Sequence, residues 1–265
     1  MSTQSLFVQR WRLGTDSYRP PDDPIRTADY DVAELPDDAV AKSFVVQHHY
    51  SGSYPAARWR FGLWHRGALQ GIAVFSHPCN DRVLTNVFPG QATDSVELGR
   101  FVLLDAVPGN GETWMLGQCF RRLRREGLAG ILAFSDPCRR LNRRGIPVFG
   151  GHVGTIYQAH NAAYLGRGTP RTLTLLPDGG ILSDRAQQKV RAAERGVRYG
   201  VRLLVAFGAE PPRSQVPREL AEWLRAWKQR LCRTVRHRGN HKYAWALHRH
   251  VRLPLGLPYP KQIDR

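Results

Sequence analysis

The chain has 265 residues, a mass of 30.0 kDa and a formal charge of +17, from 39 basic and 22 acidic side chains. Apolar residues make up 42% of it and the mean hydropathy is −0.42, which excludes wholesale disorder and leaves enough apolar side chains for a core. Because no apolar run approaches the roughly 20 residues that cross a bilayer, and the N-terminus lacks the pattern of a secretory signal, we expect a soluble cytoplasmic protein.

The first third of the chain predicts a connector, a helix and a hairpin. Residues 14–38 are rich in Pro and Asp, which favours an extended connector. Acidic residues then open a short helix over 39–46, which ends near Gly52. Two apolar runs at 59–64 and 69–75, separated by a short turn, indicate a β-hairpin.

The middle of the chain predicts a strand, a central helix and a second strand. Residues 96–104 have the composition of a strand whose alternation breaks near Gly99, which permits a β-bulge. An amphipathic helix over 112–126 follows a Gly-bearing turn. A short apolar strand at 131–134 leads into a basic, Gly-rich loop over 137–154.

The last part of the chain predicts a mixture of helices and strands. The expected elements are a helix over 155–165, strands at 172–176 and 180–183, a basic helix from 185, a strand at 201–206 and a helix over 217–231. The whole order predicts a mixed α/β fold, with a mostly antiparallel sheet flanked by helices. We expect a catalytic domain over 1–185 and a basic helical extension over 186–265.

Cysteine and histidine spacing gives little sign of a metal or disulfide. The four cysteines, Cys79, Cys119, Cys138 and Cys232, contain no Cys-x-x-Cys pair. The histidine pairs of the tail, at 237/241 and 248/250, have no carboxylate or cysteine close by in sequence. The prediction therefore assigns no metal ligand, although the histidines before Tyr50 leave a metal possible in principle.

The excess positive charge is concentrated toward the C-terminal end. Residues 1–120 carry 10 basic and 13 acidic side chains, residues 121–184 carry 10 and 4, and residues 185–265 carry 19 and 5. Such a surface attracts polyanions, and arginine suits forked contacts with phosphate. We therefore expect DNA as a partner, bound by Arg139, Arg140, Arg143, Arg144, Arg236, Arg238 and Lys242, with aromatic side chains of the tail stacking on bases.

The order of elements is similar to that of the GCN5-related N-acetyltransferases (the GNAT fold). In that family, backbone N–H groups of a turn at the start of the central helix bind the pyrophosphate of acyl-CoA. Gly109-Asn110-Gly111 matches the second half of the family turn, and Ala106 stands where the family has Arg or Gln. The resemblance implies that these three residues bind acyl-CoA, such as acetyl-CoA.

Four short motifs resemble a divergent branch of that fold, the Mom family of phage-type DNA-modifying proteins. They are His49-Tyr50-Ser51-Gly52, Glu97-Leu98-Gly99-Arg100, Phe134-Ser135-Asp136 and the segment from Tyr157 to Gly166. The resemblance implies conversion of adenine in DNA to its N6-carbamoylmethyl form, which protects the DNA from restriction. For a phage-encoded protein it also implies the host cytoplasm.

Two candidate catalytic residues belong to the first two motifs. Tyr50 follows two histidines at a helix end, where a phenol can hydrogen-bond a base or relay a proton, or simply form an amphipathic boundary. Arg100 stands inside an apolar strand, where a guanidinium needs a partner. Glu97, Asp136 or an anionic substrate group can be that partner.

Two more candidates belong to the later motifs. Asp136 ends an apolar strand and can accept a proton from an amine, or cap the following loop. Tyr157 and Tyr164 lie seven residues apart, on one face of the expected helix, and we select Tyr157 as the residue that steadies a leaving thiolate. His49, Ser51 and Asn161 are the expected substrate-binding residues.

The function predicted from these features is a DNA base-modifying transferase. Adenine N6 is a poor nucleophile, and a paired base must leave the duplex before an enzyme can reach it. Two alternatives remain open at this point. One is an ordinary N-acetyltransferase acting on a protein or a small amine, and the other is a non-catalytic nucleic-acid-binding protein on the same scaffold.

Overall fold

The computed structural model describes residues 8–20, 24–78, 80 and 82–264, so Cys79 and part of the Pro/Asp-rich segment lie outside the described residues. The chain forms two compact units. The sheet unit comprises residues up to Pro137 together with His152–Gly168 and Asn240–Ile263. The helical unit comprises Cys138–Gly151, Thr169–Gly239 and the last two residues.

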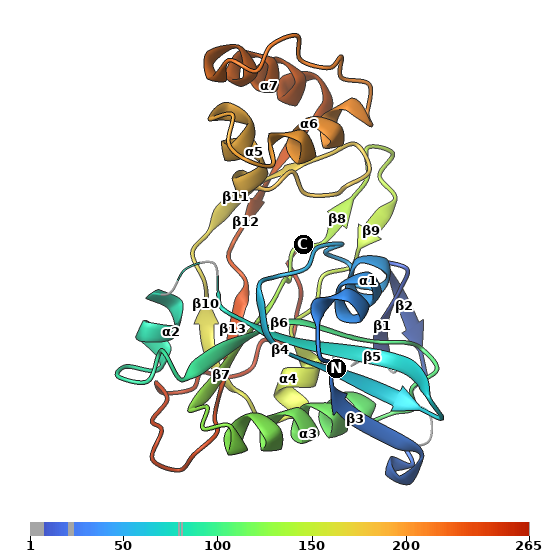
Figure 1. Cartoon of the computed structure of the whole chain (residues 1–265), viewed down its shortest axis with the longest axis vertical. Coiled ribbons are helices and arrows are strands. Elements are labelled where there is room, and N and C mark those ends of the chain that lie inside the picture. Colours follow the sequence, from blue (N-terminus) through green and yellow to red (C-terminus); the bar gives the residue numbers. More distant parts are fainter. Residues whose placement is uncertain (1–7, 21–23, 79, 81, 265) are drawn as a thin grey trace. The chain divides into compact units, whose positions relative to one another are not determined.

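The sheet unit contains the larger part of the regular structure (Figure 1). Its helices are the 3-10 turn η1 (Thr27–Asp29), α1 (Asp38–His48), α2 (Arg82–Val87), α3 (Gly111–Arg125) and α4 (Thr155–Ala159). Its strands are β1 (Val8–Arg12), β2 (Thr15–Arg19), β3 (Tyr30–Glu34), β4 (Ala57–His65), β5 (Ala68–Ser76), β6 (Ser95–Leu103), β7 (Gly130–Ser135), β10 (Ala163–Arg167) and β13 (His241–Ala246).

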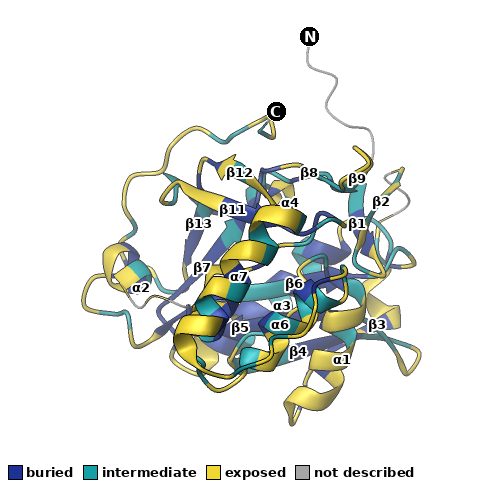
Figure 2. Ribbon diagram, turned by 90° about the horizontal axis from the view of Figure 1, so that it is seen from above, coloured by how far each residue is buried: buried dark blue, intermediate teal, exposed yellow. Residues whose placement is uncertain are grey.

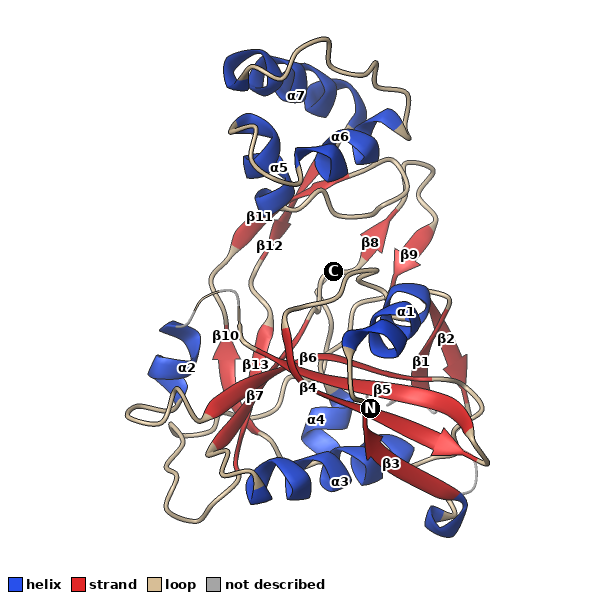
Figure 3. Ribbon diagram, in the orientation of Figure 1, coloured by secondary structure: helices blue, strands red, loops and turns tan. Residues whose placement is uncertain are grey.

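Seven of these strands form one sheet in the order β10-β13-β7-β6-β5-β4-β3. Every neighbouring pair is antiparallel except β6 and β7, which are parallel and joined through α3. Helices α3 and α4 cover one face of the sheet, and α1 packs on the other (Figures 1 and 3). The predicted mixed α/β class, with a mostly antiparallel sheet flanked by helices, is confirmed.

Strands β6 and β7 separate partway along their length. They pair only over Ser95–Leu98 and Gly130–Ala133. Beyond that point β6 continues along β5, while the end of β7 pairs with β13. An opening between the carboxyl ends of two parallel strands is a frequent place for a ligand site in α/β sheets.

A β-bulge at Gly99 confirms the predicted break in alternation. Arg100 pairs with Val74 and Leu98 with Phe75, so Gly99 is an extra residue in β6. The buried side chains change parity across the bulge, from Val96 and Leu98 to Phe101 and Leu103. As a result Glu97 and Arg100 share the face of the sheet opposite to this core.

The central helix is held to the sheet by the apolar stripe that its sequence predicts. Met115, Leu116, Cys119, Phe120 and Leu123 are all buried in one core with the inner faces of the strands. The helix begins at Gly111, one residue before the prediction, and ends at Arg125 before Gly127. This placement fixes the turn that precedes the helix next to the end of β6.

The helical unit has its own core. Its helices are α5 (Asp184–Arg191), α6 (Val197–Val205) and α7 (Pro217–Leu231), and its strands are β8 (Arg140–Leu141), β9 (Pro147–Phe149), β11 (Arg171–Leu175) and β12 (Arg233–His237). The helices bury apolar side chains that include Val190, Leu204 and Leu220, while much of α7 is exposed (Figure 2). Residues 138–151 and 169–239 carry 19 basic against 6 acidic side chains.

Several sequence-based elements are wrong. The helix expected over 155–165 stops at Ala159, and Tyr164 belongs to strand β10, because Asn161 turns the chain with a φ of 56°. The strand expected at 201–206 is helix α6, whose apolar side is buried against α5 and α7. The hairpin expected between 172–176 and 180–183 forms only as an isolated antiparallel bridge between Leu175 and Ile181, and the ladder partner of β11 is β12.

Three segments that the sequence predicts as connector, loop or tail contain regular structure. The expected connector over 14–38 contains β2, η1 and β3, and the basic loop over 137–154 contains the short hairpin β8–β9. The C-terminal tail supplies β13, an interior strand of the sheet next to the edge strand β10. Each compact unit is therefore built from several separate stretches of the chain, whereas the sequence predicts one boundary at residue 185.

Candidate active site

The candidate active site lies where β6 and β7 part. Arg100 follows the bulge of β6, and Asp136 is the residue directly after β7. His49 and Tyr50 follow the end of α1, which packs on β4, β5 and β6. Tyr157 comes from α4, on the other face of the sheet.

Tyr50 belongs to a cluster of four rings from three segments. Its ring centroid lies 4.2 Å from that of His49, 4.5 Å from Trp11 and 5.9 Å from His152. The backbone N–H of His152 donates a 2.8 Å hydrogen bond to the carbonyl oxygen of Asp136. Through His152 the Tyr50 cluster therefore reaches the end of β7, where the buried Asp136 lies.

Arg100 is held by the loop that follows α1. Its Nε donates to the carbonyl oxygen of Ser53 at 2.8 Å, and its Nη2 contacts Ser53 Oγ at 2.8 Å. Its Nη1 donates to the carbonyl oxygen of Gly99 at 2.5 Å. Thus the hydrogen-bond partner is Ser53, which sequence reasoning did not propose. The positive charge still acts on Glu97, His49 and Tyr157.

Glu97 is a functional candidate that sequence reasoning treated only as a partner for Arg100. Burial raises the pKa of its carboxyl group from 4.5 to about 7, and the nearby charge of Arg100 opposes this rise. A carboxyl group with such a pKa can both take and release a proton near neutral pH. The signal in the sequence was a lone carboxylate in an apolar strand, three residues before an arginine.

Tyr157 is buried and keeps its proton. Burial raises the pKa of its phenol, and interactions with Tyr50 and Glu97 raise it further, while Arg100 lowers it. The same interactions show that Tyr157 lies within electrostatic range of all three residues. The structure thus brings Tyr50, Arg100 and Tyr157 together, with Asp136 connected through His152.

His49 is neutral at neutral pH. Burial lowers the pKa of its imidazole well below 6.5, and the charges of Arg100 and His152 lower it further. The backbone N–H of Ser51 donates to His49 Nδ1 at 3.1 Å, and Ser51 Oγ lies 2.9 Å from the same atom. Because Nδ1 accepts, the ring proton is assigned to Nε2. Ser51 therefore orients His49.

Asn161 does not join the cluster. It occupies the left-handed turn after α4, and its backbone N–H donates to the carbonyl oxygen of Gln158 at 3.1 Å. Since α4 ends at Ala159, Asn161 is not on the helix face of Tyr157 as predicted. Its side chain is exposed.

Gly154 packs closely against the site. With a φ of 75°, it leaves room for neighbours that an added Cβ would meet: Tyr243 at 2.8 Å, Tyr157 at 2.9 Å and Ser135 Oγ at 3.2 Å. Ser135 is fully buried, and its hydroxyl has no hydrogen-bond partner in the described part of the chain. A buried hydroxyl without a partner is uncommon, and this one lies beside Gly154, which also packs against Tyr157.

We expect Gly154→Ala to displace Tyr157 and to lower activity at least tenfold, because both the contacts and the positive φ disfavour a side chain there. Gly145→Ala is the matched control, since Gly145 also has a positive φ but an added Cβ meets nothing within 4 Å. Activity and thermal unfolding of both variants measure the effect. Equal loss of activity in the two variants would show that backbone strain, and not the site contact, is responsible.

The expected acyl-CoA turn is covered by the N-terminal hairpin of β1 and β2. Arg10 donates to the carbonyl oxygens of Leu104 and Val107 at 2.8 and 3.0 Å, and Arg19 also donates to Val107. The carbonyl oxygen of Gly109 accepts from the backbone N–H of Ile25 at 2.8 Å. The carbonyl oxygens of the turn thus accept hydrogen bonds from other parts of the chain.

A carboxylate also stands in the first turn of α3. Glu112 is buried and pairs with Arg10 at 2.5 Å. The backbone N–H of Gly111 is directed to the carbonyl oxygen of Pro108 at 3.3 Å, and an added Cβ at Gly111 would lie 2.5 Å from Val107. Arg10 neutralises Glu112, and its guanidinium group is thereby unavailable to a phosphate at this helix start. The residues of Gly109-Asn110-Gly111 therefore do not fit the CoA pyrophosphate that the resemblance implies.

The predicted DNA-binding arginines are mostly exposed. Arg139, Arg143, Arg144, Arg236 and Arg238 present exposed side chains on the helical unit. Arg140 is a correction, because it is buried and its guanidinium lies 3.8 Å from the ring centroid of Phe149. Lys242 lies on β13 of the sheet unit and is half-buried.

No group of three or more histidine, cysteine, aspartate or glutamate side chains is gathered for a metal ion among the described residues. In the same residues, the helices are too short or too polar to cross a membrane.

Comparison with known proteins gives one family and a few distant structures. The model of the Mom protein family matches residues 29–200. An N-acetyltransferase from Staphylococcus aureus Mu50 is 16% identical, with 44% of this chain and 56% of that chain covered and a TM-score of 0.27. The chain thus spans little more than half of that enzyme.

A tandem GNAT protein from the clavulanic acid biosynthesis pathway, solved without AcCoA, is 9% identical. The similarity covers 83% of this chain and 99% of that chain, with a TM-score of 0.42. No curated protein matches the chain at a significant level.

Proposed function

Because the chain belongs to the Mom protein family, we propose that it is a DNA-modifying enzyme that converts adenine to an N6-substituted, carbamoylmethyl-type adenine and so protects DNA from restriction. The observation that carries the proposal is the convergence of Glu97, Arg100, Tyr50 and Tyr157 where β6 and β7 part. Three of the four motifs of the family resemblance contribute to this convergence. Asp136 adds the remaining one.

The proton acceptor in the proposed reaction is Glu97. The exocyclic amine of adenine loses a proton when N6 bonds to the carbon of the transferred group. The bond from that carbon to the leaving group of the donor breaks in the same step, and its electron pair departs with the leaving group. A carboxyl group with a pKa of about 7 is well matched to this task near neutral pH. Asp136 is buried directly after β7, and we propose that it accepts a hydrogen bond from the adenine amine and positions it.

Tyr157 and Arg100 complete the chemistry. Since burial raises the pKa of Tyr157, its phenol acts as a hydrogen-bond donor to an oxygen or sulfur atom of the donor molecule. Arg100, fixed by Ser53, keeps positive charge beside the reacting groups. The turn at Gly109–Gly111 does not fit CoA pyrophosphate, so no part of the donor molecule is assigned to that turn.

The aromatic cluster suits an unpaired base. An enzyme acting on N6 has to extrude the adenine from the duplex and hold it against apolar surfaces. Tyr50, with Trp11 at 4.5 Å between ring centroids, offers such a surface next to Glu97 and Arg100. Trp11 comes from β1, outside the matched residues 29–200, so this part of the site is not covered by the family match.

DNA is the proposed partner of the exposed arginines. The 13 excess positive charges in residues 138–151 and 169–239 favour a polyanion of any sequence. Arg139 directly precedes β8, Arg143 and Arg144 lie in the turn between β8 and β9, and Arg236 lies on β12. We expect binding that weakens steeply with salt concentration.

The proposal is tested by digesting plasmid DNA from cells that express the protein with restriction enzymes whose sites contain adenine. We expect resistance with the wild type and full cleavage with Tyr50→Ala at equal soluble expression, because alanine removes the ring against which the base is held. CoA turnover on a small amine without DNA, and cleavable plasmid, would instead indicate an ordinary N-acetyltransferase. Salt-sensitive DNA binding by both proteins with cleavable plasmid would indicate a non-catalytic DNA-binding protein.

A further inference from the structure

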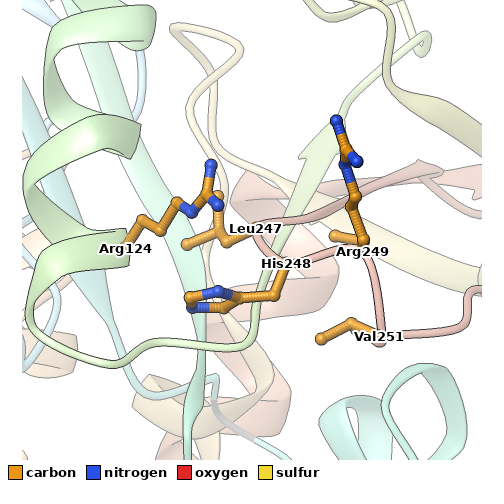
Figure 4. A pocket seen from close by; sticks show the side chains of 6 residues that line it. Arg124, Leu247, His248, Arg249 and Val251 are labelled. Atoms are coloured by element: carbon orange, nitrogen blue, oxygen red, sulfur yellow. The ribbon is translucent and has the colours of Figure 1, made fainter.

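A pocket of the sheet unit lies away from the candidate active site. It has a volume of about 500 Å³ and is lined by Arg124, Ala246, Leu247, His248, Arg249 and Val251 (Figure 4). Ala246 pairs with Gly130 at the start of β7, whereas Asp136 follows the end of that strand. At about 3.3 Å per strand residue, the two sites are roughly 17 Å or more apart.

The loop that forms one side of the pocket is fixed by the core. The backbone N–H of Leu247 donates to the carbonyl oxygen of Ala129 at 2.8 Å, and that of Val251 donates to the carbonyl oxygen of His248 at 3.1 Å. Leu247 and Val251 are both buried in apolar clusters. Arg249 therefore projects from a tight turn anchored on both sides.

Positively charged side chains line the pocket, and no carboxylate in its lining neutralises them. None of its six lining residues is acidic. Within the described part of the chain, neither Arg124 nor Arg249 has a side-chain hydrogen bond or ion pair. The ring of His248 stacks on that of His250, with centroids 5.3 Å apart and planes inclined by 22°. In Figure 4 the guanidinium group of Arg124 lies near the ring of His248, and the side chain of Arg249 extends from the same loop as His248 in another direction.

The negative end of the α3 dipole explains only part of this charge. It favours cations such as Arg124 in the last turn of the helix. It does not account for His248 and Arg249, which come from another segment. The segments 121–129 and 246–253 together hold six arginines and one carboxylate, Glu126, so the cationic surface extends beyond the pocket itself.

Arginine forks combined with an imidazole suit a phosphate group. We propose that this pocket binds a backbone phosphate of DNA, an inference that rests on the proposed function for the choice of DNA. The extension of the positive charge along α3 and the following loop fits a polymer of phosphates better than a single small anion. The pocket would thus hold the DNA at a point remote from the modified base.

The test compares DNA binding by Arg124→Gln/Arg249→Gln with that by Arg66→Gln/Arg82→Gln. The control pair is also exposed and in the sheet unit, but it lies in the β4–β5 turn and at the start of α2. Affinity for a short DNA duplex is measured by fluorescence anisotropy at several salt concentrations. We expect the pocket variant to bind about tenfold more weakly and with a log–log salt slope smaller by about one, and the control to change little.

The outcomes separate this inference from the proposed function. Tight DNA binding by the wild type with an unchanged affinity and slope in the pocket variant would overturn the pocket assignment alone. No binding of DNA by the wild type would overturn both. Binding of inorganic pyrophosphate that depends on Arg124 and Arg249, with DNA binding unaffected by their replacement, would assign the pocket to a small phosphorylated molecule and overturn the choice of DNA.

Discussion

Glu97→Gln is expected to lower DNA modification at least 100-fold and, at the same time, to make the protein more stable at pH 8. The loss of activity follows because glutamine cannot accept the proton of the adenine amine. The gain in stability follows because the site holds a carboxylate that burial disfavours. A residue with only a structural role would not show both effects.

The stability effect has a defined pH range. The pKa of Glu97 is about 7 in the folded protein and near 4.5 in the unfolded chain. The folded state therefore binds the proton more tightly, and the stability that this contributes is lost as pH rises from about 4.5 through about 7. We expect Glu97→Gln to exceed the wild type by about 3 kcal/mol at pH 8 and to match it below pH 4.5.

Urea unfolding at pH 8 and at acidic pH measures this difference, and the activity of the wild type should fall as pH drops through about 7. Glu126→Gln is the matched control, because Glu126 is exposed at the end of α3. Full activity in Glu97→Gln, or a variant that is less stable than the wild type at pH 8, would contradict the role of Glu97 as proton acceptor.

The second large effect is expected from Arg10→Met. Arg10 is buried, pairs with Glu112 at 2.5 Å and donates to the carbonyl oxygens of Leu104 and Val107. Removing the cation leaves the buried carboxylate of Glu112 without compensation, which costs about 3–5 kcal/mol. Because whole domains are stable by only about 5–15 kcal/mol, this is a large fraction of the total.

The free energy of unfolding in urea measures the loss. Arg12→Met in the same strand is the control, since Arg12 is exposed. We expect Arg10→Met/Glu112→Gln to recover part of the stability, because the second change removes the uncompensated charge. A single variant as stable as Arg12→Met would show that the Arg10–Glu112 pair does not hold the N-terminal hairpin on the turn before α3.

The elements that the sequence predicts well are those with local patterns. The β4–β5 hairpin joins neighbouring segments through a short turn, and the apolar stripe of α3 repeats at helical spacing. The bulge at Gly99 also leaves a local trace, the change in alternation within β6. In each case the interactions that form the element involve residues close together in the chain.

The elements that sequence reasoning missed depend on distant partners. β13 becomes an interior strand because it pairs with β7, more than 100 residues earlier. The apolar run in α6 resembles a strand, and only packing against α5 and α7 shows that it is a helix. Propensity and periodicity carry no information about such contacts.

The candidate site shows the same limit. The motifs identify Tyr50, Arg100 and Tyr157 as candidates. They do not predict that Arg100 bonds to Ser53, because that contact depends on how the loop after α1 folds. Trp11 reaches Tyr50 from β1, in a segment whose partners lie far along the chain. Asn161 was misplaced because the end of α4 at Ala159 has no strong local signal.

The central claim is that the residues gathered where β6 and β7 part modify adenine in DNA. Mass analysis of nucleosides from DNA of expressing cells tests it most directly. With the wild type we expect a heavier adenosine species in place of part of the deoxyadenosine, and with Asp136→Ala we expect deoxyadenosine alone. Unmodified deoxyadenosine in both, with each protein folded and soluble, would contradict the claim.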